Sequence, residues 1–297
     1  MRFSIITPFY KGNKYVHKLI EMAEQNLESL RKASIEAELE LIIVNDSPEI
    51  EVELTANSKE IELVVLKHEK NSGIQQARVT GLQNSSGEYI VFLDQDDEIV
   101  ADCLLQEYIT MQDADVVVSN LLFEHSKGNA QIFYKSRGQF KNVFSLQAYT
   151  KGHNRIISPG HCMIRKSCIP NEWITNIMKV NGSDDLFLWI LLLIKKHKFV
   201  MYEKPLYIHK YTGGNLSAEV TKMDKSSLEM ADILKRIDYV PNNVIKDIVR
   251  SRSLSLKMEN LGMMKKFLFV ISNIDLYLCR IFWKLREYSG LFSNKEE

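Results

Sequence analysis

The stretch Tyr89-Ile90-Val91-Phe92-Leu93-Asp94-Gln95-Asp96-Asp97 indicates a buried strand that ends in a group of carboxylates. Its first five residues are apolar and follow turn-forming serine and glycine, a pattern that is typical of a buried strand. The aspartates come at the carboxyl end of the strand, which is where open α/β sheets place their ligands. Carboxylate oxygens suit Mg²⁺ or Mn²⁺, and substrate phosphates commonly complete the shell of such an ion. The stretch therefore predicts a divalent metal that holds a phosphate group.

Three other interpretations of the acidic group can be compared with the sequence. Asp97 could instead cap a helix that begins near Val100, and this simpler interpretation stays open. A helix-loop-helix calcium site needs glycine at its sixth position, where this chain has Ile99, so that interpretation fails. A phosphatase with an aspartate nucleophile expects threonine or valine at the fifth position, which is Glu98 here, and it remains a weaker alternative.

The composition favours a folded protein with no overall attraction for nucleic acid. The chain has 297 residues, 45% of them hydrophobic, which is enough for one large domain with an appendage or for two small ones. Basic and acidic side chains both number 38, so an electrostatic partner must be met locally. The charge is uneven, because residues 222–297 hold 14 basic and 10 acidic side chains. The C-terminal part is therefore the basic part.

The cysteines and the N-terminus favour a cytoplasmic protein. The four cysteines have neither a metal-binding spacing nor the density of a disulfide framework: Cys103, Cys162, Cys168 and Cys279. The apolar run at residues 3–6 is too short for a secretory signal and is followed by polar residues. We therefore expect the protein in the cytoplasm.

Strand-like and helix-like segments alternate through the first part of the chain. Strands are expected at residues 3–7, 39–44, 62–66, 89–93 and 115–119, and helices at 14–33, 74–83 and 101–111. This order predicts an α/β fold of the Rossmann-like kind, with a mostly parallel central sheet covered by helices on both faces. The ligand crevice should then lie above the strand ends.

The expected strand ends bring together the parts of a nucleotide-binding site. The first strand ends in Thr7, Pro8, Phe9 and Tyr10, and the second ends at Asp46. An aromatic pair, a carboxylate and a metal site match the base, its imide hydrogen and the diphosphate of a nucleotide. Each feature has a simpler alternative, because the aromatic residues could be ordinary packing and Asp46 could belong to a turn.

The chain resembles the inverting glycosyltransferases of family 2, which have the GT-A fold. The matching segments follow one another in the order of the family: Ser4 to Tyr10, Ile43 to Ser47, Asn71-Ser72-Gly73 with Ala77, Arg78 and Gly81, and Asp94-Gln95-Asp96. The resemblance is strong over residues 2–120 and weaker to residue 217. It implies a catalytic domain at 1–217, with the nucleotide-sugar part at 1–120 and the acceptor part at 121–217, and a helical extension at 218–297.

The resemblance also implies roles for the residues of these segments. Thr7, Phe9 and Asp46 would surround the base of a nucleotide-sugar, and the neighbouring Pro8, Tyr10 and Gln95 would line the same site. Asp94 would face the ribose or the sugar, and Asp96 would hold the metal that bridges the diphosphate. Asn71 and Arg78 follow the family's helix-opening motif, in which Arg78 would position the donor; a salt bridge on the helix surface is an equal alternative. The second strand carries one carboxylate where the family usually has two, because Asn45 precedes Asp46.

A second acidic pair, Asp184 and Asp185, comes before the apolar run that begins at Leu186. Favourable interaction with the dipole of a helix explains one carboxylate in a first turn, but hardly two. Inverting sugar transfer needs a base that takes the proton of the acceptor hydroxyl, and the family has its base in an acidic pair of this kind. By resemblance, Asp185 is the base and Asp184 orients the acceptor or caps the helix.

The segment from Tyr207 to Ser217 resembles the family's closing loop over the diphosphate. His209 could complete the metal shell, and Lys210 could meet the phosphate charge. Gly213 and Gly214 would give the loop its mobility. A strand end with a flexible connector is an equal alternative.

The basic C-terminal part reads as helices, and residues 263–288 mix apolar side chains with lysine and arginine. Polar residues interrupt the segment, so no run approaches the ~20 apolar residues of a membrane span. An amphipathic helix that carries Trp283 and flanking cations can lie in a membrane interface. Packing on the catalytic domain, or on a second subunit in a homodimer, is the competing interpretation.

Together these observations predict a metal-dependent, inverting glycosyltransferase. Its donor would be a nucleotide-sugar, most simply a UDP-sugar, and its cofactor Mn²⁺ or Mg²⁺. Its acceptor would be a hydroxyl of a glycan or of a lipid-linked saccharide in the synthesis of cell-surface polysaccharide, at the cytoplasmic side and in peripheral contact with the membrane. A nucleotidyltransferase, a phosphatase and an inactive glycan-binding module are the alternatives.

Overall fold

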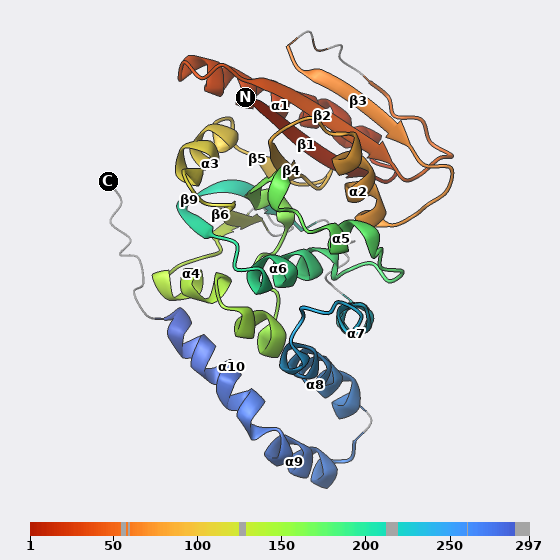
Figure 1. The fold of residues 1–297 in the computed structure, drawn as a ribbon, viewed down its shortest axis with the longest axis vertical. Helices are drawn as coiled ribbons and strands as arrows, with labels where there is room; N and C mark the ends of the chain where they lie inside the picture. The colour runs from red at the N-terminus through yellow and green to blue at the C-terminus, as the bar shows by residue number, and fades with distance from the viewer. Residues whose placement is uncertain (55–57, 59, 125–128, 212–218, 260, 289–297) are drawn as a thin grey trace. The chain divides into compact units, whose positions relative to one another are not determined.

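The structure is a computed structural model that describes residues 1–54, 58, 60–124, 129–211, 219–259 and 261–288. The chain divides into two compact units (Figure 1). Unit 1 consists of Met1–Phe133, Ser158–Ile177 and His197–Asn215, and unit 2 of Tyr134–Ile157, Met178–Lys196 and Leu216–Glu297. Tyr134–Ile157 and Met178–Lys196 therefore belong to the same unit as the C-terminal helices, and the domain boundary at residue 217 stays a prediction.

Unit 1 is built on one sheet with the strand order β3-β2-β1-β4-β8-β6-β9-β5, and β7 pairs with β6. The strands are β1 (Arg2–Phe9), β2 (Glu38–Asn45), β3 (Glu62–Lys67), β4 (Tyr89–Phe92), β5 (Glu98–Ile99), β6 (Val116–Glu124), β7 (Ala130–Ile132), β8 (Cys162–Arg165) and β9 (Phe199–Lys210). The expected strands and the α/β class are confirmed. Strands β1 to β4 pair in parallel, whereas β8 is antiparallel to both β4 and β6, so the second half of the sheet is mixed.

The parallel register brings three strand ends to one edge of the sheet. Phe9 of β1 lies opposite Asn45 of β2, and Ile6 of β1 lies opposite Phe92 of β4. Nearly every residue of β1 and β2 is buried, on both faces of the strands. Consecutive burial of this kind is typical of parallel strands covered by helices on both sides. The edge at the carboxyl ends of β1, β2 and β4 is therefore held by a rigid core.

The helices that cover this sheet come mainly from the crossovers between its strands. They are α1 (Asn13–Lys32), α2 (Ile74–Asn84), α3 (Cys103–Met111), α5 (Asn171–Thr175) and the short turns η2 (Pro159–His161) and η3 (Lys166–Cys168). Helix α1 buries an apolar stripe that runs from Val16 through Leu19, Ala23 and Leu27 to Leu30. This spacing follows the helical period, so the stripe faces the core along the helix.

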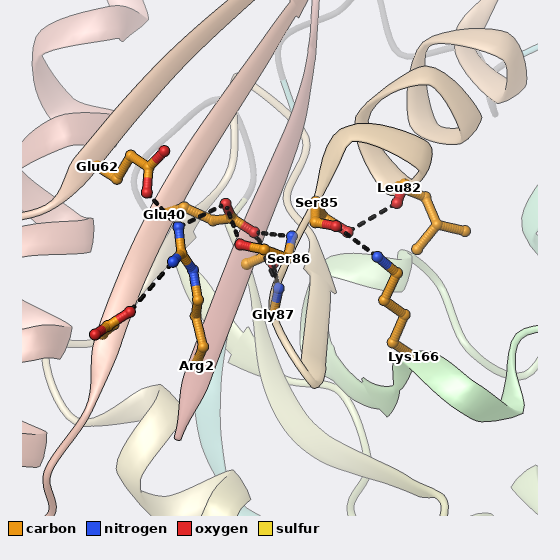
Figure 2. A network of polar contacts seen from close by, with 10 residues as sticks. Arg2, Glu40, Glu62, Leu82, Ser85, Ser86, Gly87 and Lys166 are labelled. Atoms are coloured by element: carbon orange, nitrogen blue, oxygen red, sulfur yellow. Dashed lines mark hydrogen bonds and ion pairs between the residues drawn. The ribbon is translucent and has the colours of Figure 1, made fainter.

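A buried carboxylate ties the other edge of the sheet together (Figure 2). Glu40 of β2 accepts hydrogen bonds from the Ser86 backbone N–H (2.6 Å), the Ser86 hydroxyl (2.9 Å) and the Gly87 N–H (3.1 Å), and Arg2 lies against it at 3.3 Å. Burial alone would raise the pKa of Glu40, but its hydrogen bonds from Ser4, Ser86 and Gly87 hold the pKa below its usual value. Ionised Glu40 therefore fixes the turn that opens β4.

Unit 2 is helical. Its helices are α4 (Arg137–Val143), the π-helical turn η1 (Ala148–Gly152), α6 (Asp184–Ile194), α7 (Val220–Leu234), α8 (Asn242–Glu259), α9 (Met263–Ser272) and α10 (Ile274–Glu287) (Figure 1). Helix α6 is buried at every residue from Leu186 to Leu192, as expected for the centre of a helical core. The buried guanidinium of Arg252 holds α8 to η1 by donating to the carbonyl oxygens of Gly152 and Tyr149. No helix in the described part of the chain has both the length and the apolar character that a membrane crossing requires.

Candidate functional site

The first part of the site lies where β2 ends and α2 begins. Both oxygens of the Asp46 carboxylate are engaged: Oδ1 accepts from the Ser72 N–H (2.7 Å) and contacts His68 Nδ1 (2.8 Å), and Oδ2 accepts from the Gly73 N–H (2.9 Å). Gly73 has a φ of +91°, a left-handed conformation that favours glycine. The Asn71-Ser72-Gly73 segment therefore turns its backbone toward Asp46. Asn71 itself is exposed.

Asp46 consequently has a structural task that the sequence did not reveal. An ionised carboxylate has about four lone-pair directions, and three are used here. Only the remaining lone pair of Oδ2 would be available to accept the expected hydrogen bond from a nucleotide base. His68 was not anticipated at all, and its second ring nitrogen contacts the Thr80 hydroxyl of α2 at 2.9 Å.

The end of β1 separates its two aromatic residues. Phe9 is 0% exposed and packs in the core with Thr7 and Pro8, whereas the Tyr10 side chain is 50% exposed. The expected contact of Phe9 with a base has no support from this arrangement, which matches the alternative of ordinary packing. Gln95 clamps the Tyr10 backbone, since its Oε1 accepts from the Tyr10 N–H (2.9 Å) and its Nε2 donates to the Tyr10 carbonyl (3.1 Å). Tyr10 is thus the aromatic surface that this edge presents.

Asp94, the first carboxylate after β4, is held by a buried cation. The guanidinium of Arg78, which is 3% exposed, donates to Asp94 Oδ1, and the Ser158 hydroxyl donates to Oδ2 at 3.3 Å. Arg78 does form a salt bridge, as the alternative expected, but its side chain is buried rather than on the helix surface, and only Asp94 is partly exposed. Arg78 neutralises and orients Asp94.

Asp97 is almost completely buried and joins the end of β4 to β9. Its carboxylate accepts from the Tyr207 hydroxyl and from the Lys210 backbone N–H (2.8 Å), and it contacts His209 Nδ1 at 3.0 Å. Helix α3 begins only at Cys103 and its N-cap, Asp102, makes no side-chain capping bond. The interpretation of Asp97 as a helix cap is therefore wrong.

Asp96 lies between Asp94 and Asp97 in the sequence, and its pKa is raised. Burial, together with the charges of Asp97 and Asp94, raises the pKa of Asp96 to about 6. The same carboxylates raise the pKa of His209 above its usual value, against the effect of its burial. His209 therefore lies within the electrostatic field of the three aspartates, as the sequence predicts for a partner in the same site.

The donor types around Asp96 suit a divalent cation, although no three of the ligand atoms that the structure describes there lie within 4.8 Å of one another. Hard carboxylate oxygens of Asp96 and Asp94, with an imidazole nearby, make a donor set that Mn²⁺ and Mg²⁺ accept. A cation there would relieve the repulsion that raises the pKa of Asp96. The match lies in the types of donor atom, which are carboxylate oxygens and an imidazole nitrogen.

Lys210 ends β9 and pairs with Glu98 of β5 through its ammonium group. Tyr207, Ile208, His209 and Lys210 thus belong to a strand, which matches the strand-end alternative for this segment better than a loop. The glycines that were expected to give a closing loop its mobility, Gly213 and Gly214, lie outside the described residues.

The second acidic pair belongs to unit 2 and opens α6. Asp184 is buried and Asp185 is half-buried in the first turn of the helix, where the helix dipole favours negative charge. Asn154 donates to Asp185 Oδ2 at 2.6 Å. Asn154 comes from a distant part of the sequence with no motif around it, so the sequence did not indicate that it orients Asp185.

A further group of possible ligands lies at the opposite edge of the sheet. Asp115, Cys168 and His197 place one ligand atom each within 4.8 Å of one another, at the amino ends of β6 and β9. Asp115 already accepts from the Cys168 thiol (3.2 Å) and the Lys198 N–H (2.8 Å) and contacts His197 Nδ1 (3.0 Å). This group connects η3 to the sheet and lies apart from the strand ends that carry Asp94 to Asp97.

Comparison with known protein families finds one whose model matches more than half of this chain. The family model described as Glycosyl transferase family 2 matches residues 4–171, which include the ends of β1, β2 and β4 and most of the residues around Asp94. The Streptococcus pneumoniae glycosyltransferase GlyA is 26% identical over 232 residues, which are 73% of this chain and 31% of GlyA. The chain thus spans about a third of the length of this relative.

Solved structures share the fold. The structure of Staphylococcus aureus TarS residues 1–349 with UDP-GlcNAc aligns with a TM-score of 0.58 at 15% identity and covers 93% of this chain and 80% of that one. The Pyrobaculum calidifontis mannosyltransferase PcManGT, with GDP-Man and Mn²⁺, aligns with a TM-score of 0.53 at 12% identity and covers 96% of this chain and 84% of that one. In sequence, TarS, a poly(ribitol-phosphate) β-N-acetylglucosaminyltransferase, is 28% identical over 141 residues, 46% of this chain and 23% of TarS.

Proposed function

Because this chain belongs to glycosyltransferase family 2, we propose that it transfers a sugar from a nucleotide-sugar to a hydroxyl of a glycan or a lipid-linked saccharide. The observation that carries the proposal is the set of carboxylates at the strand ends. Arg78 neutralises Asp94, and β9 neutralises Asp97, while the pKa of Asp96 is raised to about 6. Such a site gains most from a ligand that brings positive charge.

The donor we propose is a UDP-sugar bound along the edge of β1, β2 and β4. TarS, which shares the fold, binds UDP-GlcNAc, and this supports the choice of uridine. The exposed ring of Tyr10 offers a stacking face for the base, and Asp46 offers one remaining acceptor direction to a ring N–H. Asn71, Arg78 and Gln95 act by shaping this edge, since Arg78 and Gln95 are bonded to protein groups.

We further propose that Asp96 and His209, beside Asp94, hold Mn²⁺ or Mg²⁺. The Mn²⁺ complex of PcManGT supports a metal in this fold. When bound, the ion would supply positive charge to the leaving diphosphate. The protein's part is to keep Asp94 oriented through Arg78 and to keep His209 against Asp97, so that both reach the site in a fixed geometry.

The proposed base is Asp185. In an inverting transfer, a carboxylate takes the proton of the acceptor hydroxyl as its oxygen attacks the anomeric carbon from the face opposite the leaving group. Asn154 donates to one oxygen of Asp185 and so fixes the side chain. Asp184, buried in the same turn, would orient the acceptor or stabilise the helix start. The setting we propose is cell-surface polysaccharide synthesis at the cytoplasmic side of the membrane, in line with the polymer that TarS modifies.

Incubation of the purified chain with Mn²⁺ and a panel of nucleotide-sugars tests the proposal through slow donor hydrolysis. We expect one donor to release a nucleoside diphosphate, and Asp96→Asn to lower this release at least tenfold. Asp113→Asn is the matched control, because Asp113 is an exposed carboxylate that pairs with Lys198 at the surface. Release of inorganic phosphate or pyrophosphate would instead favour a phosphatase or a nucleotidyltransferase, and an unchanged rate in Asp96→Asn would refute the assigned site.

A further inference from the structure

Helix α10 has an apolar stripe that faces away from the protein. Leu278, Ile281, Phe282 and Leu285 are 57%, 53%, 60% and 65% exposed, and Ile274 one turn earlier is 52% exposed. Their spacing of three and four residues places them on one side of the helix. Solvated helices carry polar residues in such positions, so this stripe needs a partner to cover it.

Helix α9 repeats the arrangement. Met264, Phe267, Leu268 and Ile271 follow the same spacing and are 79%, 64%, 59% and 49% exposed. Helix α10 follows α9 directly in the chain (Figure 1). Asn273, which lies between them, is buried. Half of the large apolar side chains that are exposed in the described part of the chain therefore come from these two helices.

The orientation of the stripe is set by the opposite face of α10. Leu276 and Trp283 are buried at 1% and 3% exposure, Asn142 of α4 donates to the Trp283 carbonyl (3.3 Å), and Arg155 pairs with Glu287 at 2.6 Å. Trp283 therefore packs inside unit 2 and does not belong to the exposed stripe. Helix α10 therefore contacts α4 through the face of Leu276 and Trp283. The exposed stripe lies on its other face and is not covered by α4.

The charges beside the stripe are positive. Lys265, Lys266, Lys284 and Arg286 accompany the exposed apolar residues. The acidic residues of the two helices are both committed, because Asp275 pairs with Arg250 (2.6 Å) and Glu287 pairs with Arg155. The two helices that carry the apolar stripe thus have more basic than acidic side chains.

A groove between α8 and α9 lies apart from this stripe. It has a volume of about 470 Å³ and is lined by Val249 and Ile245 of α8 and Phe269 of α9. By the helical period, Phe269 falls on the other side of α9 from the exposed residues, so the groove is not part of the stripe.

We propose that the exposed face of α9 and α10 docks on an anionic membrane surface, with the apolar stripe in the interface and the lysines against the headgroups. A second copy of this chain is a poorer occupant. A two-fold dimer would place the same basic face against itself, and like charges would then oppose each other across the contact. An anionic bilayer satisfies both the apolar stripe and the cations.

Sedimentation of the full chain with vesicles tests this inference. We expect it to pellet with vesicles of phosphatidylglycerol and phosphatidylcholine, and to do so at least tenfold less with phosphatidylcholine alone or in high salt. The double variant Phe282→Glu/Leu285→Glu should reduce vesicle binding at least tenfold while leaving the thermal unfolding midpoint near that of the wild type, because both side chains are exposed. Ile109→Glu, at a 55% exposed position of α3, is the matched control and should bind like the wild type.

Two outcomes would overturn the inference. One is equal, salt-independent binding of wild type and double variant, or no binding of either. The other is a concentration-dependent dimer in solution that the double variant abolishes, which would assign the face to a second copy. Donor hydrolysis in solution does not depend on vesicles, so its presence or absence reports on the proposed activity separately from this face.

Discussion

Glu107→Gln should change how the stability of this protein depends on pH. Glu107 of α3 is 0% exposed, and neither of its carboxylate oxygens has a hydrogen-bond partner within the described residues. Burial raises the pKa of Glu107 from 4.5 to about 8. The nearby side chains of Ser119 and Cys103 lower this pKa, but by less than burial raises it. The folded protein therefore keeps this carboxyl protonated at neutral pH, whereas the unfolded chain ionises it.

The magnitude follows from proton linkage. Between pH 4.5 and about 8 the folded state holds one proton more than the unfolded state, so rising pH lowers the free energy of unfolding. The loss is about 1.4 kcal/mol for each pH unit, or about 3 kcal/mol from pH 6 to pH 8. Glutamine has no titration and should remove this slope. The interval lies above the pKa of Asp96, which is about 6, so that carboxylate contributes little to it.

Urea unfolding of the wild type and of Glu107→Gln at pH 6, 7 and 8 measures the effect. The wild type should lose about 3 kcal/mol more than the variant across this range. The comparison of slopes is independent of any constant cost of burying the amide. Glu53→Gln, at an exposed position of the same residue type, should leave the wild-type slope unchanged. Equal slopes in the wild type and in Glu107→Gln would refute the protonated, buried carboxyl.

Three further substitutions test contacts within each unit, two of them in unit 1 and one in unit 2. Gly73→Ala should lower the free energy of unfolding by about 1 to 2 kcal/mol and weaken UDP binding measured by calorimetry, because alanine resists a φ of +91° and the Gly73 N–H bonds to Asp46; unchanged stability and affinity would contradict this. Glu40→Gln should cost about 2 to 3 kcal/mol at pH 7 in urea unfolding, and the difference from the wild type should shrink as pH falls through the lowered pKa of Glu40, where the wild type is itself protonated; a difference independent of pH would argue against the ionised form. Asp185→Asn should retain UDP binding in calorimetry and lose sugar transfer at least a hundredfold, and an equal loss of donor affinity would contradict its role as a base.

The sequence predicted the edge at the carboxyl ends of β1, β2 and β4 well, because local pattern and parallel topology agree there. The run that ends at Leu93 had to be a buried strand, and parallel strands bring their carboxyl ends to one edge, so Asp46 and Asp94 could be placed together before any coordinates. Phe9 and Tyr10 show where the pattern was insufficient. Both are aromatic residues at a strand end, and only the packing of the helices over β1 decides which ring is buried.

Contacts between residues far apart in the sequence could not be predicted from local patterns. The role of Asp97 depends on β9, more than 100 residues later, which brings Tyr207, His209 and the Lys210 N–H to its carboxylate. Asn154 meets Asp185 in the same way, from a segment without regular structure. The sequence left open whether the helix of Trp283 lies in a membrane interface or packs on the protein, because tryptophan suits both settings; in the structure its side chain is buried.

The raised pKa of Asp96 is the physical argument for the divalent ion that we propose at this edge. Here Arg78 satisfies Asp94, and Tyr207, His209 and the Lys210 N–H satisfy Asp97, so the repulsion collects on Asp96 and raises its pKa. A divalent ion bound there would lower the pKa of Asp96, and the contacts of Asp94 and Asp97 would hold these two carboxylates in place beside the ion.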